Sequence, residues 1–409
     1  MKIKIITLVV LTLFIGIIVS PISNSYINND NTYSLENDKE SIEFLFDRYI
    51  TFLMKLAHKP SISTCIIINE CVVWSKGYGL YDIENKKPAT PDALYLLASI
   101  SKTVAATAIM QLYEQGLFDL DDDVNNYLPF SLRNPNYPDT SITFRMLLSH
   151  RSSLASDNSD RLSTSYIPGD PDIPSYPYPW LEEYLTPNGI GYHSSVWSDS
   201  PPGEKYYYAN IGFSIIGYLV EIISGQNFNE YCKEHIFRPL EMYNASYRLK
   251  DLNISKIAIP YSYESRNYIP NPHYGMLFVH PGASLRTSVE ELSHFLIAHM
   301  NGGIYKDVRI LNESTVELMH TAHYPLDKRG RGYGLGWIIK DPILGKKELG
   351  HSGGWIGVHT LMTFRPDDDT AIIIFTNSLD STQFSRPVTS LAFLLIKNTL
   401  FRKANRLTS

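Results

Sequence analysis

Strand-like sequence lies near the two ends of this 409-residue chain, with no long β-branched run between them, and this limits the possible folds more than any other feature. Near the start, Cys65–Ile68 and Cys71–Trp74 predict a hairpin with a tight turn, which Gly77 and Gly79 would end. Four β-rich runs near the end, separated by short turns, predict an antiparallel meander. They are Gly336–Lys340, Lys347–His351, Val358–Phe364 and Ala371–Thr376. We therefore expect one sheet built from both ends of the chain.

The remainder of the chain is predicted to be helical or rich in loops. Apolar residues recur at three- and four-residue steps in the first expected helix, and Gly116 and Gly225 are placed to end two others. The expected helices are Ser41–Ala57, Ser99–Gln115, Gly212–Ser224 and Phe384–Lys403. The fold class is therefore α/β (α+β), with an antiparallel sheet flanked by helices at 41–115 and 275–404 and an inserted all-helical region at 116–274.

The N-terminus has the pattern of an export signal. Two lysines precede the mostly apolar stretch Ile5–Val19, which is long for a signal-peptide core and short for a membrane span of about 20 residues. We expect 1–25 to be a signal peptide, or an anchor that holds the protein in the membrane through residues 5–19, followed by a polar linker at 26–40. In both cases the domain at 41–404 would be exported, to the periplasm, the outer face of the membrane or the medium.

Composition argues against several functional classes. The net charge is −6, and no basic stripe suggests a nucleic-acid partner. Cys65 and Cys71 would point to opposite faces of the predicted hairpin and Cys232 lies in a predicted helix, so a disulfide framework is not expected. No group of His, Cys, Asp or Glu has metal-ligand spacing, and we expect neither a metal nor a cofactor.

The first indication of chemistry is Ser99-Ile100-Ser101-Lys102, at the start of the second expected helix. A serine and a lysine three residues apart lie on one face of a helix, within reach of each other. A lysine removes the proton of a serine hydroxyl only when it is itself uncharged, and burial favours that form. The simpler interpretation is a helix start with an exposed lysine, because so short a motif also arises by chance.

Two later motifs favour the chemical interpretation. Tyr208-Ala209-Asn210 follows the Ser-x-x-Lys motif, and His351-Ser352-Gly353 lies in the C-terminal meander. In this order the three motifs resemble the serine β-lactamase and penicillin-binding protein superfamily, above all its class C-like branch. Connecting phrases are similar as well, so the resemblance covers residues 41–400. These phrases are QLYEQGLFDLDDDVNNYLP (111–129), ITFRMLLSHRSSL (142–154), PGASLRTSVEELSHFL (281–296) and YGLGWII (333–339).

The resemblance implies a β-lactamase/DD-peptidase fold and a covalent acyl-enzyme mechanism. Ser99 would be the nucleophile, Lys102 the base that activates it, and Tyr208 the group that protonates the leaving group and then activates water. The amides of Ser99 and Gly354, which follows the motif residue Gly353, would hold the oxyanion. The alternative for Gly354 is a strand glycine selected for close packing.

Two motif residues leave alternatives open. Asn210 would hydrogen-bond Lys102 and the acyl amide of the substrate, or it would cap the helix that follows it, and both roles can hold together. His351 would contact the substrate, or it would be a strand-edge histidine with a structural hydrogen bond. Class C β-lactamases usually carry a lysine there, as a fixed cation for the carboxylate of a β-lactam, whereas histidine is mostly neutral at pH 7.

Histidine at position 351 therefore ranks small esters and D-amino-acid peptides above β-lactams as substrates. The sequence predicts an exported serine hydrolase of the esterase or D-amino-acid peptidase type, acting on a small-molecule ester, peptide or β-lactam. A β-lactamase or a DD-carboxypeptidase is the first alternative. The second is a penicillin-binding or interaction protein of the same fold without turnover, against which the intact motifs argue.

Several other residues are candidates for the surroundings of the site. Ser101 and Ser352 are expected to line the cleft, and Trp355 either forms its wall or belongs to the core. His150, in the LLSH phrase, is expected to be a structural residue at a helix end. The segment 155–203 is expected to form long surface loops. Its aromatic residues that would cover the site are Tyr176, Tyr178, Trp180 and Trp197.

Overall fold

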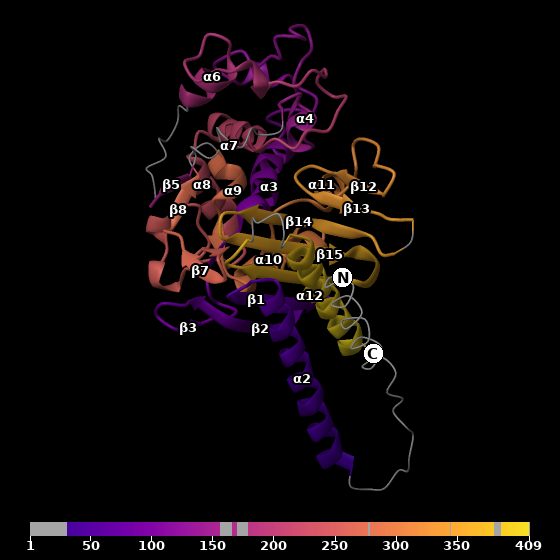
Figure 1. Ribbon diagram of the computed structural model, residues 1–409. Coiled ribbons are helices and arrows are strands. Elements are labelled where there is room, and N and C mark those ends of the chain that lie inside the picture. Colours follow the sequence, from indigo (N-terminus) through magenta and orange to yellow (C-terminus); the bar gives the residue numbers. More distant parts are fainter. Residues whose placement is uncertain are drawn as a thin grey trace. The chain divides into compact units, whose positions relative to one another are not determined.

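The computed structural model describes residues 31–155, 166–169, 179–276, 279–343, 345–379 and 386–408 (Figure 1). The chain forms two compact units, Met1–Ile50 and Thr51–Ser409. Helix α2 (Asn31–Leu56) begins in the first unit and ends in the second, and it starts within the segment 26–40 that was expected to be a polar linker. The leader expected at 1–25 lies outside the described residues. No helix in the described part of the chain is long and apolar enough to span a membrane.

Eight strands of the described residues form one antiparallel sheet in the order β12-β13-β14-β15-β16-β1-β2-β3 (Figure 1). Strand β1, near the start of the chain, pairs with β16, near its end, in a register that sets Cys65 opposite Ile373. The prediction of one sheet built from both chain ends is confirmed. Its strands are β1 (Ser61–Ile68), β2 (Cys71–Asp82), β3 (Lys87–Pro88), β12 (Arg331–Tyr333), β13 (Ile338–Lys340), β14 (Glu348–Trp355), β15 (Val358–Arg365) and β16 (Thr370–Thr376).

Two details of the sheet differ from the prediction. Gly77 and Gly79 lie inside β2, which continues to Asp82, and therefore do not end the hairpin. A Cβ atom on Gly77 would lie 2.0 Å from the carbonyl oxygen of Ala89, and Gly79 has a φ of 74°. These glycines allow a close backbone approach and a left-handed conformation, whereas the sequence pattern indicated a turn. Strand β14 is also longer than expected and continues to Trp355.

Strand β1 lies between β16 and β2, and all eight of its residues are buried. Because side chains alternate between the two faces of a strand, such burial requires cover on both faces. Helices α10 (Val289–Met300) and α12 (Arg386–Leu407) both pack against β1 and β16. Cys65 of β1 shares a core cluster with Leu292 of α10. The three cysteines of the chain are free thiols, as expected.

The helical region lies between the two groups of strands in the sequence. Gly116, just after α3, has a φ of 69°, and Gly225 ends α7 with a φ of 70°, so both predicted helix ends are confirmed. The short helix η5 (Lys233–Phe237) is a π-helix. The α-helices outside those already named are α3 (Ser101–Glu114), α4 (Phe144–Leu148), α6 (Pro179–Leu185), α7 (Asn210–Ser224), α8 (Phe228–Cys232), α9 (His280–Ala283) and α11 (Glu313–Met319).

Short strand pairs and 3-10 turns complete the second unit. The strand pairs within or beside the helical region depart from the expectation of an all-helical insertion, although each is only two to four residues long. The pairs are β4 (Tyr95–Leu96) with β9 (Arg286–Thr287), β5 (Tyr166–Pro168) with β8 (Tyr274–Met276), β6 (Tyr261–Glu264) with β7 (Asn267–Pro270), and β10 (Ile304–Tyr305) with β11 (Val308–Arg309). The 3-10 turns are η1 (Ala98–Ile100), η2 (Val124–Asn126), η4 (Ser194–Val196), η6 (Leu249–Asp251), η7 (Ile254–Lys256) and η9 (Pro366–Asp368).

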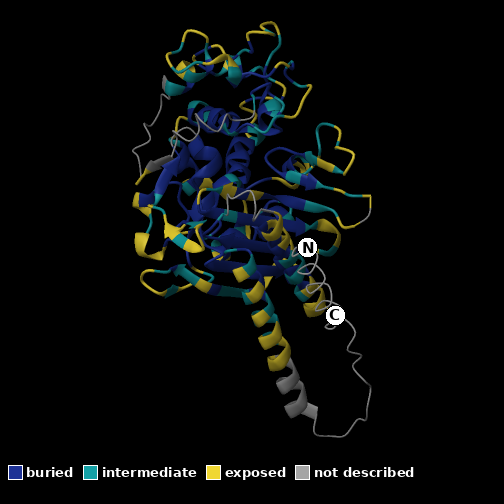
Figure 2. Cartoon of the chain, viewed as in Figure 1, coloured by how far each residue is buried: buried dark blue, intermediate teal, exposed yellow. Residues whose placement is uncertain are grey.

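Helix α3 runs through the interior of the second unit (Figure 2). Every residue from Ser101 to Leu112 is buried. The helix packs against α7 and α9, and the turn η1 that precedes it lies against β14. The Ser-x-x-Lys segment is therefore held between the helical region and the sheet.

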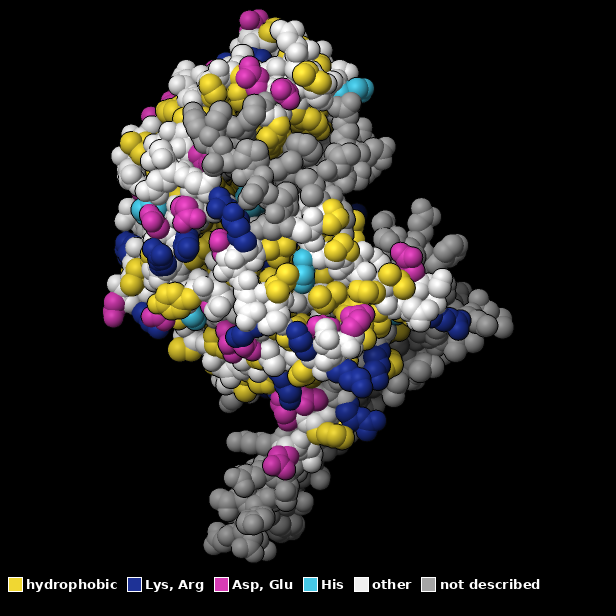
Figure 3. Space-filling view, turned by 90° about the vertical axis from the view of Figure 1, so that its left-hand side faces the viewer, with side chains coloured by type: hydrophobic (Ala, Val, Ile, Leu, Met, Phe, Trp, Pro, Cys, Tyr) yellow, Lys and Arg dark blue, Asp and Glu magenta, His cyan; other side chains and the backbone are white. Residues whose placement is uncertain are grey.

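Charged side chains are distributed over the surface. On the face drawn in Figure 3, Lys and Arg side chains are interspersed with Asp and Glu side chains. Elsewhere in the described chain, ion pairs include Lys306 with Glu241 and Lys346 with Asp368. The described residues visible in Figure 3 form no continuous basic surface of the kind that a nucleic-acid partner requires.

Candidate active site

Ser99 lies in the turn η1 directly before helix α3, and its side chain is partly exposed. The preceding residue, Ala98, has a φ of 48°, in the left-handed region that residues with a Cβ atom rarely adopt. Ser101 stabilises this turn, because its Oγ donates to Ala98 O at 2.6 Å and accepts from the Leu285 N–H at 3.1 Å. Since Ser101 is fully buried, the expectation that it lines the cleft was wrong.

Lys102 is completely buried. Its Nζ lies 3.1 Å from Ser99 Oγ, 2.6 Å from Asn210 Oδ1 and 3.0 Å from the carbonyl oxygen of Gly282. The exposed lysine of the simpler interpretation is therefore excluded. The distance to Ser99 Oγ is that of a hydrogen bond through which a proton can pass between the two groups.

Gly282 is a site residue that the sequence analysis missed. A Cβ atom there would lie 3.0 Å from Phe213 Cβ and 3.4 Å from Lys102 Nζ, so the absence of a side chain makes room for the amine. The phrase 281–296, which begins one residue earlier, resembles the superfamily. It gave no indication that the backbone carbonyl group of Gly282 would contact Lys102.

Asn210 is the first residue of α7, and the N-cap residue Ala209 makes no side-chain capping bond. Of the two roles considered for Asn210, the contact with Lys102 is present, while the N-cap position itself is occupied by Ala209. Tyr208 is half-buried, and its ring centroid lies 5.0 Å from Lys102 Nζ. The structure thus brings Ser99, Lys102, Tyr208 and Asn210 together.

Gly353 and Gly354 differ in their surroundings. A Cβ atom on Gly353 would lie 2.1 Å from Leu97 O and 3.1 Å from Ala98 Cβ, so β14 and η1 approach each other closely at this point. Gly354 follows Gly353 in β14, and Ser99 follows Ala98 in η1, so the two amides lie next to this point of approach. Among the described residues, a Cβ atom on Gly354 would meet only Leu379 Cδ2, at 3.6 Å. Close packing therefore explains Gly353 and does not explain Gly354.

His351 is buried, and both of its ring nitrogens have partners. Nδ1 lies 2.7 Å from the carbonyl oxygen of Ser352, which can only accept, so Nδ1 carries the proton. Nε2 then accepts the hydroxyl proton of Tyr333 at 2.6 Å. Burial is the main cause that lowers the pKa of His351 to about 3, so the ring is neutral. The structural hydrogen bonds of the second alternative for His351 are therefore present, although β14 lies between β13 and β15 and His351 is not at a strand edge. Tyr333 is a second residue that sequence analysis missed.

Comparison with known proteins places this arrangement in a family. Residues 46–395 match the sequence model of the Beta-lactamase family, which is most of the chain. This chain belongs to the β-lactamase family. Its fold and superfamily, the serine β-lactamases and penicillin-binding proteins, are those that the three motifs predicted, and the members of this superfamily include serine hydrolases.

The individual relatives of this β-lactamase-family protein are distant. Protein flp of Staphylococcus aureus (strain N315) is 25% identical over 345 residues, which cover 84% of this chain and 64% of flp. The chain thus spans less than two thirds of that relative. A putative D-alanyl-D-alanine carboxypeptidase of Escherichia coli (strain K12) is 26% identical, with 81% of each chain covered. D-amino acid amidase from Ochrobactrum anthropi SV3 has the same fold, with a TM-score of 0.70, 20% identity, and 89% of this chain and 99% of the amidase covered.

His150 follows helix α4, as a structural residue at a helix end would, but its contacts extend to the site. Its carbonyl oxygen accepts from the Tyr207 N–H at 2.9 Å, and its Nδ1 accepts from the Ala209 N–H at 3.2 Å. Its ring centroid lies 4.3 Å from that of Tyr208 and 4.6 Å from that of Tyr333. No pattern in the sequence indicated these contacts.

Two of the aromatic residues proposed to cover the site are described. Trp197 belongs to the main hydrophobic core and Trp180 packs against it, so both contribute to the packing of the second unit. Tyr176 and Tyr178 lie outside the described residues. Trp355 is half-buried and packs against a small core cluster that includes Ala98. Within the described segments, no group of three or more His, Cys, Asp or Glu side chains could hold a metal ion.

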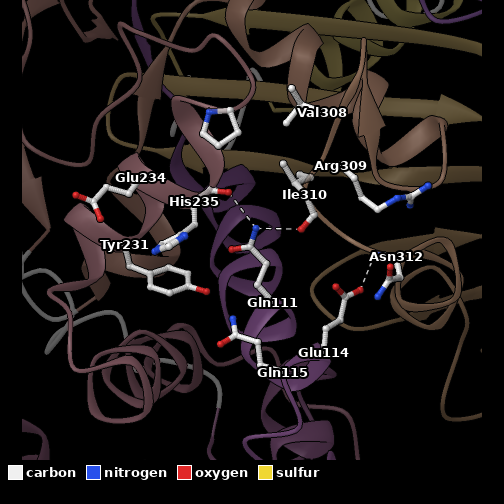
Figure 4. A pocket seen from close by; sticks show the side chains of 11 residues that line it. Gln111, Glu114, Gln115, Tyr231, Glu234, His235, Val308, Arg309, Ile310 and Asn312 are labelled. Atoms are coloured by element: carbon white, nitrogen blue, oxygen red, sulfur yellow. Dashed lines mark hydrogen bonds between the residues drawn. The ribbon is translucent and has the colours of Figure 1, made fainter.

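A separate cleft of about 460 Å³ lies toward the other end of α3 (Figure 4). Gln111 is at its base, where Nε2 donates to the carbonyl oxygens of His235 and Ile310, both at 3.0 Å. At 1.5 Å per helical residue, Gln111 is roughly 18 Å from Ser99. None of the motif residues lines this cleft, so it is not part of the candidate site.

Proposed function

We propose that this protein is a serine hydrolase that forms an acyl-enzyme at Ser99 on a small ester or amide. The observation that carries this proposal is the 3.1 Å contact between Ser99 Oγ and the Nζ of the buried Lys102. Ser99 is partly exposed, so a substrate can reach the hydroxyl group while the base behind it is shielded from water. Membership in the β-lactamase family supports the same reaction class.

In the first half-reaction, uncharged Lys102 Nζ takes the proton of Ser99 Oγ, and Oγ forms a bond to the carbonyl carbon of the substrate. The amides of Ser99 and Gly354 stabilise the resulting oxyanion. Tyr208 Oη then donates its proton to the leaving alcohol or amine as the bond between that group and the carbonyl carbon breaks. The acyl group remains on Ser99, beside a tyrosinate and a lysine ammonium group.

In the second half-reaction, the Tyr208 tyrosinate takes a proton from water, and the hydroxide adds to the acyl carbon. The bond between this carbon and Ser99 Oγ breaks, and Oγ takes its proton back from Lys102. The carboxylic acid leaves, and all three side chains return to their starting protonation states.

The neutral ring of His351 favours a substrate that has no carboxylate near this residue. Because the ring is buried and neutral, it supplies no positive charge for the carboxylate of a β-lactam. We therefore rank small esters and D-amino-acid amides or peptides above β-lactams. The second candidate is a DD-carboxypeptidase, which the name of the Escherichia coli relative favours.

The test compares the full-length protein with its Ser99→Ala variant. Both are incubated with a nitrophenyl ester of a short fatty acid, a peptide ending in D-alanyl-D-alanine, and a chromogenic cephalosporin, while turnover and intact mass are followed. We expect ester turnover that is lost in Ser99→Ala, with little cephalosporin hydrolysis. Release of D-alanine alone would favour the carboxypeptidase, and fast cephalosporin turnover a β-lactamase. A stable adduct without turnover, or no reaction at all, would contradict the proposal.

We also propose that the protein acts outside the cytoplasm, on the basis of the apolar stretch Ile5–Val19 behind two lysines. N-terminal sequencing after cell fractionation tests this. A new N-terminus near residue 26 would agree with a cleaved signal peptide. An intact chain in the membrane fraction would agree with an uncleaved anchor. An intact chain in the cytosolic fraction would contradict both.

A further inference from the structure

We propose that His150 is a positioning residue that fixes the ring of Tyr208 and thereby sets how efficiently the leaving group is protonated. This inference rests on the acyl-enzyme mechanism proposed above. It assigns a role to a residue outside the three motifs, on the turn that follows helix α4.

The backbone contacts of His150 surround Tyr208 in the sequence. The Tyr207 N–H donates to His150 O at 2.9 Å, and the Ala209 N–H donates to His150 Nδ1 at 3.2 Å. One residue therefore holds the chain immediately before and immediately after Tyr208. Because Ala209 is the N-cap of α7, the second bond also fixes where this helix begins and so where Asn210 points toward Lys102.

The imidazole also contacts the phenol ring directly. The centroids of His150 and Tyr208 are 4.3 Å apart with an angle of 37° between the planes. Phe213 packs on the other members of the site, since its ring centroid lies 5.3 Å from that of His150 and 5.6 Å from Lys102 Nζ. A ring held by packing on one side and by its backbone on both sides has few alternative rotamers, which keeps Oη in one place.

The hydrogen bonds determine the form of the imidazole. Since Nδ1 accepts from a backbone N–H, the proton of the neutral ring is on Nε2, and a second proton on Nδ1 would break the bond to Ala209. Burial is the main cause that keeps the pKa of His150 well below its usual value. Among the described residues, Nε2 has no hydrogen-bond partner. If packing alone had selected this residue, an apolar side chain would serve without leaving a buried N–H unpartnered. The nitrogen that acts in positioning Tyr208 is therefore Nδ1, which accepts from Ala209.

The backbone conformation selects the substitutions that test this role. His150 has a φ of 58°, a conformation that asparagine tolerates and leucine does not favour. In His150→Asn, Oδ1 takes the place of Nδ1 and can accept from Ala209. In His150→Leu a side chain of similar size has no acceptor, and in His150→Gln the acceptor is displaced by one bond.

The experiment uses the full-length protein and two esters with the same acyl group. A nitrophenyl ester has a leaving group that departs without a proton, whereas an alkyl ester needs one from Tyr208. We expect His150→Leu and His150→Gln to lower kcat/KM for the alkyl ester on the order of tenfold more than for the nitrophenyl ester. Tyr208→Phe should change the ratio in the same direction, and His150→Asn should restore most of it. Because both esters are measured on one preparation, partial unfolding does not affect the ratio.

Equal losses for the two esters in His150→Leu and His150→Gln would reduce His150 to a structural role and overturn the inference. The same holds if His150→Asn loses as much as His150→Leu, or if Tyr208→Phe leaves the ratio unchanged. Ester turnover that persists in Ser99→Ala, or that is absent from the wild type, would instead overturn the proposed function. Turnover that depends on Ser99 with an unchanged ester ratio in the His150 variants would overturn the inference alone.

Discussion

At the scale of single residues, the site depends on an amine that water does not reach. Lys102 has its Nζ within 3.1 Å of Ser99 Oγ, and the same atom also contacts oxygens of Asn210 and Gly282. An amine in this position is poised to exchange a proton with the serine, and it is costly to bury. The position of the amine thus favours activity, whereas its burial lowers the stability of the folded protein.

Lys102→Met should therefore separate activity from stability. Methionine is close to lysine in length and carries no charge, so the variant removes the base and also removes the cost of burying an amine. We expect kcat/KM for the ester to fall by roughly 100- to 10,000-fold. The free energy of unfolding should change by no more than about 2 kcal/mol, because the unpaired acceptors on Asn210 and Gly282 offset the relief. Ester kinetics and urea unfolding measure the two effects.

The matched control is Lys205→Met, at an exposed lysine close to Tyr208 in the sequence. This variant should keep both activity and stability. If Lys102→Met kept its activity, or lost activity together with more than about 3 kcal/mol of stability, the lysine would be a structural residue and not the base.

At the scale of elements, the approach of β14 to η1 decides where the nucleophile lies. Gly353 permits this approach, because its backbone is in direct contact with Leu97 and Ala98 of the segment that leads into Ser99. Thr360 of the neighbouring strand β15 reinforces it, since its Oγ1 donates to Leu97 O at 2.8 Å. The sheet and the start of α3 are thus joined immediately beside the site.

Gly353→Ala and Gly354→Ala form a matched pair that tests this junction. In the first variant the new Cβ atom would meet Leu97 O at 2.1 Å and Thr360 Oγ1 at 2.4 Å, so β14 has to shift. We expect a loss of roughly 3 kcal/mol in the free energy of unfolding, together with most of the activity. In Gly354→Ala the nearest atom is a flexible side-chain carbon at 3.6 Å, and stability should stay within about 1 kcal/mol. Equal destabilisation of the two variants in urea unfolding would contradict the proposed junction.

The elements also show what the sequence allowed one to predict. The β-rich runs and the left-handed glycines at 116 and 225 carry their information locally. The sheet from both chain ends was therefore predicted, and α3 and α7 with nearly correct ends, although β1, β2 and β14 extend beyond the predicted runs and β3 and β12 were not predicted. Gly77 and Gly79 were misassigned because a glycine that ends a strand and one that permits close approach look alike in a sequence. Gly282, Tyr333 and His150 were missed as site residues because their contacts join segments far apart in the chain. Only Ser99 and Lys102 had a spacing that revealed their contact.

At the scale of the whole molecule, several histidines are buried in the neutral state. Burial lowers the pKa of His280 and of His351 to about 3, and it keeps the pKa values of His150 and His299 well below the usual range. In the unfolded chain a histidine titrates near pH 6.5. Between the two pKa values the unfolded chain therefore binds protons that the folded protein does not bind.

The free energy of unfolding should consequently fall as the pH is lowered below about 6.5, and these groups should have no effect above about pH 7.5. Each such histidine contributes a slope of about 1.4 kcal/mol per pH unit within the window. In His299→Gln, the number of protons taken up on unfolding should fall by about one, because glutamine does not titrate. Glutamine keeps a donor for Thr107 Oγ1, which lies 3.0 Å from His299 Nε2. His193→Gln, at an exposed position, is the control. Urea unfolding between pH 4.5 and 7.5 measures the slopes. A slope that is the same in wild type and His299→Gln would show that His299 takes up its proton without unfolding. A stability that rises as the pH falls would contradict the prediction for the buried histidines as a group.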